Sequence, residues 1–540
     1  MSEKEVPVVI VGGSLVGLSA GLLLARHGVR SLVLERHSGT AIHPRAAHAT
    51  QRTMEIFRSV DLEAAIRERS AEQFVQDGGV VEVETLVGGA TREFIADLNA
   101  GIRDVSPCER VFLSQHSLEP LIMERARALG VEVRFSTEAI SVEEDSSGVT
   151  TLLRDRESGA TTTVRSPYLV AADGAHGGVR RRLGIGTQGH SMFSRSITIY
   201  FRADLRSLLA GKRWAVVYVN NPRLRGFFRF EKPFDSAFLA VNTEGESSHP
   251  VRDVSTGLTP ERALDFVACA LGSREIPVAI DSIMHWDAAA EVAERLQTKR
   301  VFIAGDAAHV MPPTGGFGGN TGIQDAHNLA WKLARVIKQE APATLLATYD
   351  PERRPVARLS VEQAYTRYVL RTDPSLGAEA CEPLVNDLNI ELGYVYRSRA
   401  IAAEAPDDGA VHVSPRESRA RPGTRAPHLW LERRGQRLSS LDLYGQRFVL
   451  LAGPKAEEWC RCARIASSEE RIALDISRPG ADGLEDRTGS LSELHLIESD
   501  GCLLVRPDGF VAWRARNAQG ASVATMRSVL SVANGAAARE

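Results

Sequence analysis

The glycines near the start of the chain have the types and spacing that bind a dinucleotide. They follow residues 8–11, a run of valine and isoleucine typical of a buried parallel strand. A first glycine permits the tight turn, a later one lets a helix approach the strand, and N–H groups at the helix start hold the pyrophosphate. Serine replaces the usual middle glycine, and its hydroxyl can itself donate to phosphate. The predicted contacts are Gly12, Ser14, Leu15, Val16 and Gly17.

An acidic residue follows at the position where this motif binds ribose. A helix over 16–26 and a second strand over 31–35 complete a strand–helix–strand unit that ends in Glu35. A carboxylate there accepts from the ribose hydroxyls and repels a 2′-phosphate. We therefore predict the ADP half of FAD or NAD at this site, with Glu35 and the adjacent Arg36 as contacts.

A second chemical segment lies far along the chain. Residues 298–306 read as a buried strand that ends in Gly305 and Asp306, and a loop rich in Gly and Pro follows it. An amphipathic helix over 320–334 comes next, so its N-terminus points into this loop. Its partial positive charge suits the electron-rich end of a reduced flavin ring, and Asp306 can accept from a ribityl hydroxyl.

Composition excludes several other classes of protein. The 540 residues allow two to four domains, and 65 basic against 68 acidic residues give a net charge of −3, without a global attraction to nucleic acid or anionic membrane. The six cysteines form no Cys-x-x-Cys or zinc-type cluster, so we expect no metal. The start does not read as a secretion signal, and no apolar run approaches the roughly 18 residues of a membrane helix, so we expect a cytoplasmic protein.

Two further segments complete a family resemblance. One is residues 168–180, which contain Asp173-Gly174, and the other pairs Pro44-Arg45-Ala46 with Leu113-Ser114-Gln115. With the two glycine segments, they resemble the single-component FAD-dependent aromatic hydroxylases, the family of para-hydroxybenzoate hydroxylase and phenol hydroxylase. The whole chain is most similar to bacterial aromatic polyketide hydroxylases. One departure is Gly177, where the family usually has serine, and it weakens only the assignment of NADPH to this segment.

The resemblance implies a mechanism and the residues that serve it. NADPH, or NADH, would reduce FAD, O2 would add at the flavin C4a, and the hydroperoxide would hydroxylate a small aromatic, phenolic substrate. The catalytic residues would be Arg45, Pro313, Gly315 and Gly316. The remaining cofactor contacts would be Gln115, Asp173, Gly305, Asp306, Gly318, Gly319 and Asn320, together with Arg45, Pro313 and Gly316.

The resemblance also implies an α/β fold of three parts. A discontinuous Rossmann-like FAD-binding domain would comprise residues 1–180 and 285–400, with a helical stretch running to about 400. An inserted sheet domain, 181–284, would cover the substrate. The composition of residues 401–430, with four Pro residues and many charges within 404–427, predicts a linker or a docked excursion, and a thioredoxin-like domain would occupy 431–540. It lacks Cys-x-x-Cys, so we expect structural support or a homodimer contact instead of dithiol chemistry.

Aromatic residues in the middle segment are candidates for substrate binding. Strand-like runs occur at 196–201, 214–219 and 226–230. Because neighbours along a strand point to opposite faces, only one of Phe227 and Phe228 can share a face with Tyr200 and Tyr218. These side chains, with Pro313, are the predicted substrate contacts, although each aromatic residue taken alone is more typical of a hydrophobic core than of a pocket.

Three functions remain open from the sequence. The leading one is FAD-dependent hydroxylation of a polycyclic, polyketide-type phenol. The second is a Baeyer–Villiger or oxidative ring rearrangement of a polyketide by the same architecture. The third is a non-catalytic flavin protein that sequesters an unstable intermediate. The substrate, the position oxidised, any protein general base and the choice between NADPH and NADH are left undetermined.

Overall fold

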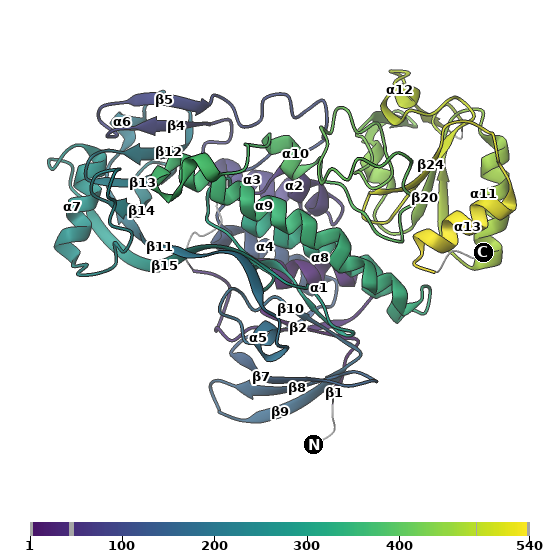
Figure 1. The fold of residues 1–540 in the computed structure, drawn as a ribbon, viewed down its shortest axis with the longest axis horizontal. Helices are drawn as coiled ribbons and strands as arrows, with labels where there is room; N and C mark the ends of the chain where they lie inside the picture. Colours follow the sequence, from purple (N-terminus) through teal and green to yellow (C-terminus); the bar gives the residue numbers. More distant parts are fainter. Residues whose placement is uncertain (1–3, 43–47, 482, 537–540) are drawn as a thin grey trace.

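The protein is built around two long helices, α8 (Phe317–Ile337) and α9 (Tyr349–Arg371), that cross the middle of the molecule. The structure is a computed structural model that describes residues 4–42, 48–481 and 483–536. Figure 1 shows a large sheet on one side of these helices, smaller sheets below them and a C-terminal lobe on the other side. None of the described helices is long and apolar enough to cross a membrane.

The nucleotide-type sheet has five parallel strands in the order β16-β10-β2-β3-β6. Its strands come from distant parts of the chain: β2 (Val8–Val11), β3 (Ser31–Leu34), β6 (Glu132–Arg134), β10 (Tyr168–Ala171) and β16 (Val301–Ile303). The predicted strands at 8–11, 31–35 and 298–306 are confirmed in position, although the last is shorter. Helices α1 (Leu15–Arg26), α4 (Gln115–Ala128) and α8 pack around this sheet. Apolar burial on both faces explains the unbroken β-branched run at β2.

A separate four-stranded sheet lies beside the nucleotide-type sheet at the lower end of Figure 1. Its order is β1-β9-β8-β7, and its strands are β1 (Lys4–Glu5), β7 (Thr137–Glu144), β8 (Val149–Asp155) and β9 (Thr161–Ser166). The loop from β9 to β10 is a single residue, Pro167, so this sheet feeds directly into the central one.

The large sheet has eight strands in the order β17-β15-β11-β14-β13-β12-β4-β5. The predicted strands are confirmed as β11 (Thr187–Arg202), β12 (Trp214–Asn220) and β13 (Leu224–Glu231). The sheet extends beyond the expected insertion: it also contains β4 (Gly79–Val83), β5 (Ala90–Ile95), β14 (Ser236–Glu244), β15 (Ala279–Ala293) and β17 (His309–Val310). Helix α7 (Pro260–Leu271) packs on one face in an apolar core, and α9 contacts β15.

The predicted helix up to residue 400 is wrong beyond α9. The chain breaks at Pro374 and at Gly377, whose φ of 102° is left-handed, and continues as short 3-10 turns and α10 (Asp387–Glu391). Proline lacks the N–H that a continuing helix needs, so the residues that follow α9 prevent the helix from running on to residue 400.

The C-terminal lobe has the strand and helix order of a thioredoxin-like domain. Strand β20 (Phe448–Ala452) is parallel to β21 (Leu474–Ser477) and antiparallel to β23 (Cys502–Val505), which pairs with β24 (Val511–Ala515). Helices α11 (Glu457–Glu470) and α13 (Val523–Ala533) cover one face. The predicted linker is docked: Gly423 donates to Val511 O at 2.8 Å, and Ala420, Ala426 and Leu429 join the core of the other face. The predicted α/β fold is thus confirmed.

Candidate active site

The first glycine turn is as tight as the motif predicts. Gly12 has a φ of 102°, and a Cβ there would lie 2.1 Å from the Ala172 carbonyl oxygen. A Cβ on Gly17 would lie 1.8 Å from the Gly12 carbonyl oxygen. Both distances are far below van der Waals contact, so any side chain would push α1 away from the strand. The turn therefore presents bare backbone at the start of α1, where Leu15 is the first helical residue.

Glu35 lies directly beside this turn. Its carboxylate is buried and accepts from the N–H groups of Gly13, at 2.8 Å, and His37, at 2.9 Å. The neighbouring Arg36 is exposed. Glu35 thus caps the glycine turn, while its predicted contact with a ribose and that of Arg36 stay predictions.

Ser14 donates to a carboxylate that the sequence reasoning missed. Its Oγ makes a short hydrogen bond to Glu119, and Gln115 Nε2 donates to the same Oγ at 2.8 Å. Glu119 is fully buried, and its other oxygen accepts from Ala41 N at 2.7 Å. The serine that departs from the motif therefore ties the turn to α4 and to the segment before residue 43. The spacing of Gln115 and Glu119, four residues on one helix face, was the available signal.

The second glycine segment meets the first through close packing. A Cβ on Gly305 would lie 2.8 Å from Val16 Cγ2, and one on Gly322 would lie 2.5 Å from the same atom. Gly305 has a φ of 61°, and the adjacent Asp306 is exposed. The structure thus brings the start of α1, the Gly305–Asp306 turn and the first turns of α8 to one place, as a shared cofactor site requires.

A fully buried acid holds the Gly305 turn. Asp325 Oδ2 accepts from Gly305 N at 3.1 Å and lies 2.7 Å from His309 Nε2, and its Oδ1 accepts from Arg353 Nε at 2.7 Å. Burial alone would raise the pKa of Asp325, but Arg353 and His309 hold it below its ordinary value. Asp325 is therefore an anionic anchor for the turn. A polar residue on the apolar face of the predicted helix was the only signal for it.

The loop before α8 carries two glycines that leave no room for a side chain against the rings of Phe317 and His48. Gly315 and Gly316 have φ values of 86° and 66°, and a Cβ on Gly316 would lie 2.1 Å from His48 Cε1. Pro313, which lies in the chain between strand β17 and Gly315, is exposed. Gly318 and Gly319 are half-buried at the start of α8. A surface of glycine and proline, with N–H groups at a helix N-terminus, fits the flavin ring that the sequence predicts.

Asn320 joins this loop to the segment around His48. Its Oδ1 accepts from Thr50 N at 2.9 Å, and its Nδ2 donates to the carbonyl oxygens of Gly316, at 2.8 Å, and His48, at 3.2 Å. Burial, with the nearby Arg110 and Arg229, lowers the pKa of His48 to about 3, so its ring is neutral. The predicted catalytic Arg45, with Pro44 and Ala46, lies outside the described residues. Sequence reasoning missed His48.

Gly177 is explained by the position of Asp173. The Asp173 carboxylate folds back and accepts from Val179 N at 3.0 Å, and a Cβ on Gly177 would lie 2.2 Å from its Cγ. Burial raises the pKa of Asp173. The glycine leaves room for this rotamer, which a serine would block.

The predicted aromatic residues divide between the two faces of the large sheet. Tyr218 and Phe227 are cross-strand partners with ring centroids 6.1 Å apart. Phe238 lies 6.0 Å from Phe227 and 5.7 Å from Tyr200, so these four rings form one aromatic face. Phe228 is a correction: it points to the opposite face, fully buried in the core against α7.

Arg229 connects the aromatic face to the glycine loop. It shares the face of Phe227, two residues away on β13, and its guanidinium lies 4.7 Å from the Phe74 ring centroid and 4.8 Å from that of Phe112. Phe112 in turn lies 5.8 Å from the His48 ring. Burial lowers the pKa of Arg229 to about 10, so it stays cationic at neutral pH. A substrate on this face would lie between the sheet and the loop at Gly316.

Comparison with known proteins shows the family of the chain. A family model described as FAD binding domain matches residues 5–364, and one described as aromatic-ring hydroxylase, C-terminal, matches 419–537. The chain is 49% identical over 520 residues to 4-methyl-5-nitrocatechol 5-monooxygenase of Burkholderia sp, covering 95% of each. It is 36% identical over 559 residues to tetracenomycin A2 monooxygenase-dioxygenase of Streptomyces glaucescens, covering 98% and 97%.

A solved structure matches over the full length. The ternary complex of aklavinone-11 hydroxylase with FAD and aklavinone superimposes with a TM-score of 0.91 at 35% identity, covering 99% of each chain. The fold and the site define a flavin-dependent monooxygenase. The chain belongs to the family of FAD-dependent aromatic-ring hydroxylases, and it uses FAD, O2 and a reduced nicotinamide co-substrate.

Proposed function

We propose that this monooxygenase hydroxylates a polycyclic, polyketide-type phenol that lies on the aromatic face. The observation that carries the proposal is the row of rings from Tyr200 through Phe238 and Phe227 to Tyr218, which leads by way of Arg229 toward the loop at Gly316. A fused ring system gains from stacking on each of these side chains. Relatives whose names specify tetracenomycin and aklavinone support the same substrate class.

The residues of the chain would bind, orient and exclude water. FAD, when bound, would activate O2 with electrons from the nicotinamide, and the glycine turns at Gly12, Gly305 and Gly316 would hold it. Arg229, cationic and buried beside the loop, would favour the ionised form of a phenol, which is the more electron-rich ring. A fused polyketide can supply this phenolate itself, so no protein base is required.

A second candidate is a compact nitrocatechol. The 49% identity to a relative named for 4-methyl-5-nitrocatechol favours it, and buried cations such as Arg229 suit an acidic catechol. We place it second because a single ring would leave most of the aromatic face uncovered.

Anaerobic reduction by NADPH separates the candidates. The purified yellow protein would be mixed with NADPH alone, with polycyclic phenols, or with 4-methyl-5-nitrocatechol, and flavin bleaching followed. We expect one ligand class to accelerate bleaching, and 18O2 to give a product with one labelled oxygen on an intact ring. Cleavage of a C–C bond would instead indicate the rearranging enzyme. If NADPH failed to bleach the flavin in the presence of every ligand, the result would contradict the proposal and favour sequestration.

Several assignments remain predictions. The role of Arg45, a homodimer and a cytoplasmic location rest on the sequence, which leaves the choice between NADPH and NADH open. So does the division into domains at 180, 284, 400 and 430.

A further inference from the structure

The aromatic face carries a second buried arginine at its far end. Arg225, Phe227 and Arg229 alternate along β13, so their side chains share one face. Arg229 lies near Phe112 and thus near the glycine loop. Arg225 is four residues away, about 13 Å along the strand. Two cations therefore bracket the aromatic face, one proximal and one distal to the predicted flavin.

Arg225 is buried without enough hydrogen-bond acceptors. Its exposed fraction is 4%, and its Nε donates to Asn220 Oδ1 at 3.1 Å. Among the described residues, its buried Nη1 has no hydrogen-bond partner. Leaving a buried charged donor unsatisfied costs more than an ordinary hydrogen bond gains, so such a group calls for a missing acceptor.

The cross-strand neighbour has the same deficit. Thr243 is paired with Arg225 in register, is fully buried, and its Oγ1 also lacks a partner within the part of the chain that the structure describes. Arg225 and Thr243 are cross-strand partners next to a register shift in this pair of strands, so the guanidinium and the hydroxyl leave neighbouring positions of the sheet and can donate together to a single oxygen. Two adjacent orphaned donors make a built site and not an isolated irregularity.

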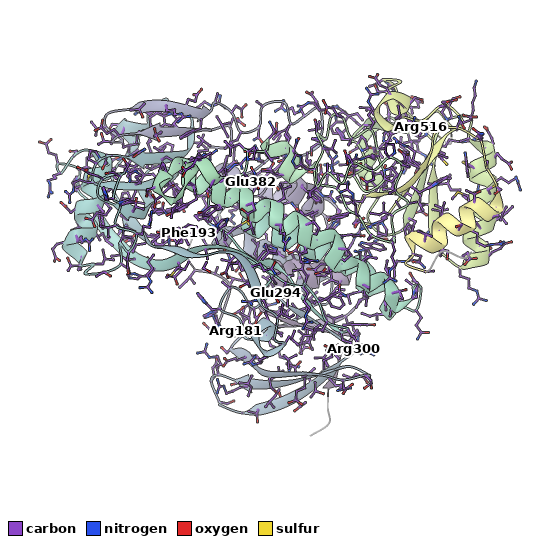
Figure 2. The ribbon with its side chains drawn as sticks, viewed as in Figure 1. Arg181, Phe193, Glu294, Arg300, Glu382 and Arg516 are labelled. Atoms are coloured by element: carbon purple, nitrogen blue, oxygen red, sulfur yellow. The ribbon has the colours of Figure 1, made fainter. Side chains whose placement is uncertain are left out.

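The surroundings keep this site positive. Burial lowers the pKa of Arg225, and the negative charge of the buried Asp373 raises it against that effect and favours the cationic form. The Asp373 oxygens accept from Arg252, at 2.7 Å, and from Ser375, at 2.5 Å. Besides Arg225, the guanidinium of Arg371 also lies near this part of the aromatic face, 5.7 Å from the Tyr218 ring centroid. In Figure 2, Phe193 marks where β11 and β15 pass beneath α9, the helix that carries Arg371.

We infer that Arg225 and Thr243 bind an ionised oxygen substituent, a phenolate or a carboxylate, at the end of the substrate remote from the oxidised ring. The inference rests on the proposed function and sharpens it. A substrate that reaches both Arg225 and the glycine loop needs several fused rings, so the site selects extended anionic polycycles over single-ring phenols. Arg225 is then a specificity-determining residue and takes no part in oxygen transfer.

A ligand-free measurement tests the orphaned charge. The melting temperature of FAD-loaded Arg225→Met would be compared with that of Arg110→Met, in which the lost guanidinium is equally buried but bonded to Glu391 at 2.7 Å. We expect Arg110→Met to lower the melting temperature and Arg225→Met to leave it unchanged or raise it. An equal loss in both variants would make Arg225 a structural residue and overturn the inference.

A ligand pair tests the recognised group. The probes are 1,8-dihydroxyanthraquinone-3-carboxylate and its carboxamide, titrated against the flavin absorbance of the FAD-loaded protein. We expect the wild type to bind the carboxylate at least about tenfold more tightly, Arg225→Met to lose that preference while keeping its affinity for the carboxamide, and Thr243→Val to lose part of it.

The outcomes distinguish a failure of the Arg225 site from a failure of the proposed substrate class. If Arg225→Met keeps the preference, or the wild type binds both probes equally, the inference fails while the polycyclic substrate class stands. If the wild type binds neither probe but binds 4-methyl-5-nitrocatechol, the proposed substrate class fails, and the inference fails with it.

Discussion

Two regions of the molecule bury arginine in opposite ways. On the aromatic face, Arg225 keeps a buried N–H without an acceptor among the described residues. At the turn between β23 and β24, Arg506 is completely buried and bonded to two carboxylates. The first arrangement leaves a donor for something else to satisfy, whereas the second satisfies every group internally.

The β23–β24 turn is inserted among the helices of the FAD-binding region. Arg506 donates to both oxygens of Glu352, at 2.6 and 2.8 Å, and Lys332 Nζ donates to the same carboxylate at 2.7 Å. Asp508 accepts from Arg506 and, at 3.2 Å, from Trp331 Nε1. Arg506 and Lys332 hold the pKa of Glu352 far below its ordinary value, despite burial.

The same interface reaches toward the cofactor site through α2 (Gln51–Arg58). Arg425 forms two hydrogen bonds to Glu55, at 2.9 and 2.7 Å, and Arg52 donates to the Asp508 carbonyl oxygen at 2.7 Å. Helix α2 starts after Thr50, which is bonded to Asn320. The carboxylates of Glu55, Glu352 and Asp508 are thus paired with cations at this interface, although Arg52 Nε and the Gln51 amide, among the described residues, lack a partner. On the aromatic face no carboxylate of the described residues is bonded to Arg225, and its unpaired donor suits a ligand.

The largest expected effect comes from breaking the paired region. Arg506→Met would leave Glu352 and Asp508 buried with too few partners, and we expect a loss of about 3–5 kcal/mol in the free energy of unfolding. Chemical denaturation of the FAD-loaded variant measures it. A loss below about 1 kcal/mol would show that the network does not hold the domains together.

Gly316→Val should have a nearly equally large effect, at the glycine loop beside the aromatic face. The new Cβ would strike the His48 ring, and valine disfavours a φ of 66°. Because displacement of about 1 Å can cost about 100-fold in rate, we expect hydroxylated product per NADPH consumed to fall steeply. Gly89→Val is the control, since Gly89 also has a positive φ, 81°, but no neighbour within 4 Å. Normal coupling in Gly316→Val would place the flavin elsewhere.

The paired region should also respond to acid in a defined range. Burial raises the pKa of Glu55, but Arg425 and Arg52 outweigh it and hold the pKa at about 2, below the ordinary value of 4.5. A depressed pKa stabilises the fold above about pH 4.5, and this contribution declines as pH falls toward 2. The melting-temperature difference between wild type and Glu55→Gln should therefore shrink on acidification. A difference independent of pH would contradict the ionised pair.

The smallest effect is expected at an exposed pair between the same two parts of the molecule. Arg58 Nε lies 2.7 Å from Asp442 Oδ1, with both side chains about one-third exposed (32% and 27%). Asp442→Asn should cost less than about 1 kcal/mol, and added salt should reduce that cost further, because solvent screens this contact. If Asp442→Asn destabilised the protein as much as Arg506→Met, burial would not explain why the two contacts differ in strength.

The sequence predicted the site wherever backbone chemistry dictates residue type. Gly12, Gly17, Gly305 and Gly316 stand where a Cβ would strike another atom, and this requirement leaves a readable pattern. Runs of β-branched and aromatic residues predicted β12 and β13, although the sequence left undecided which of Phe227 and Phe228 shares a face with Tyr218. The missed groups are side chains whose partners are distant in sequence. Glu119 bonds to Ser14, and no local pattern announces that contact.

The sequence by itself determined the cofactor, the α/β class and the order of the parts, because glycine turns, caps and hydrophobic periods act over a few residues. Only the tertiary structure decided which aromatic face is available, that residues 420–429 pack into the C-terminal core, and which buried arginines are paired. Whether a buried charge has an acceptor depends on strands and helices that meet only after folding, so no spacing along the chain encodes it.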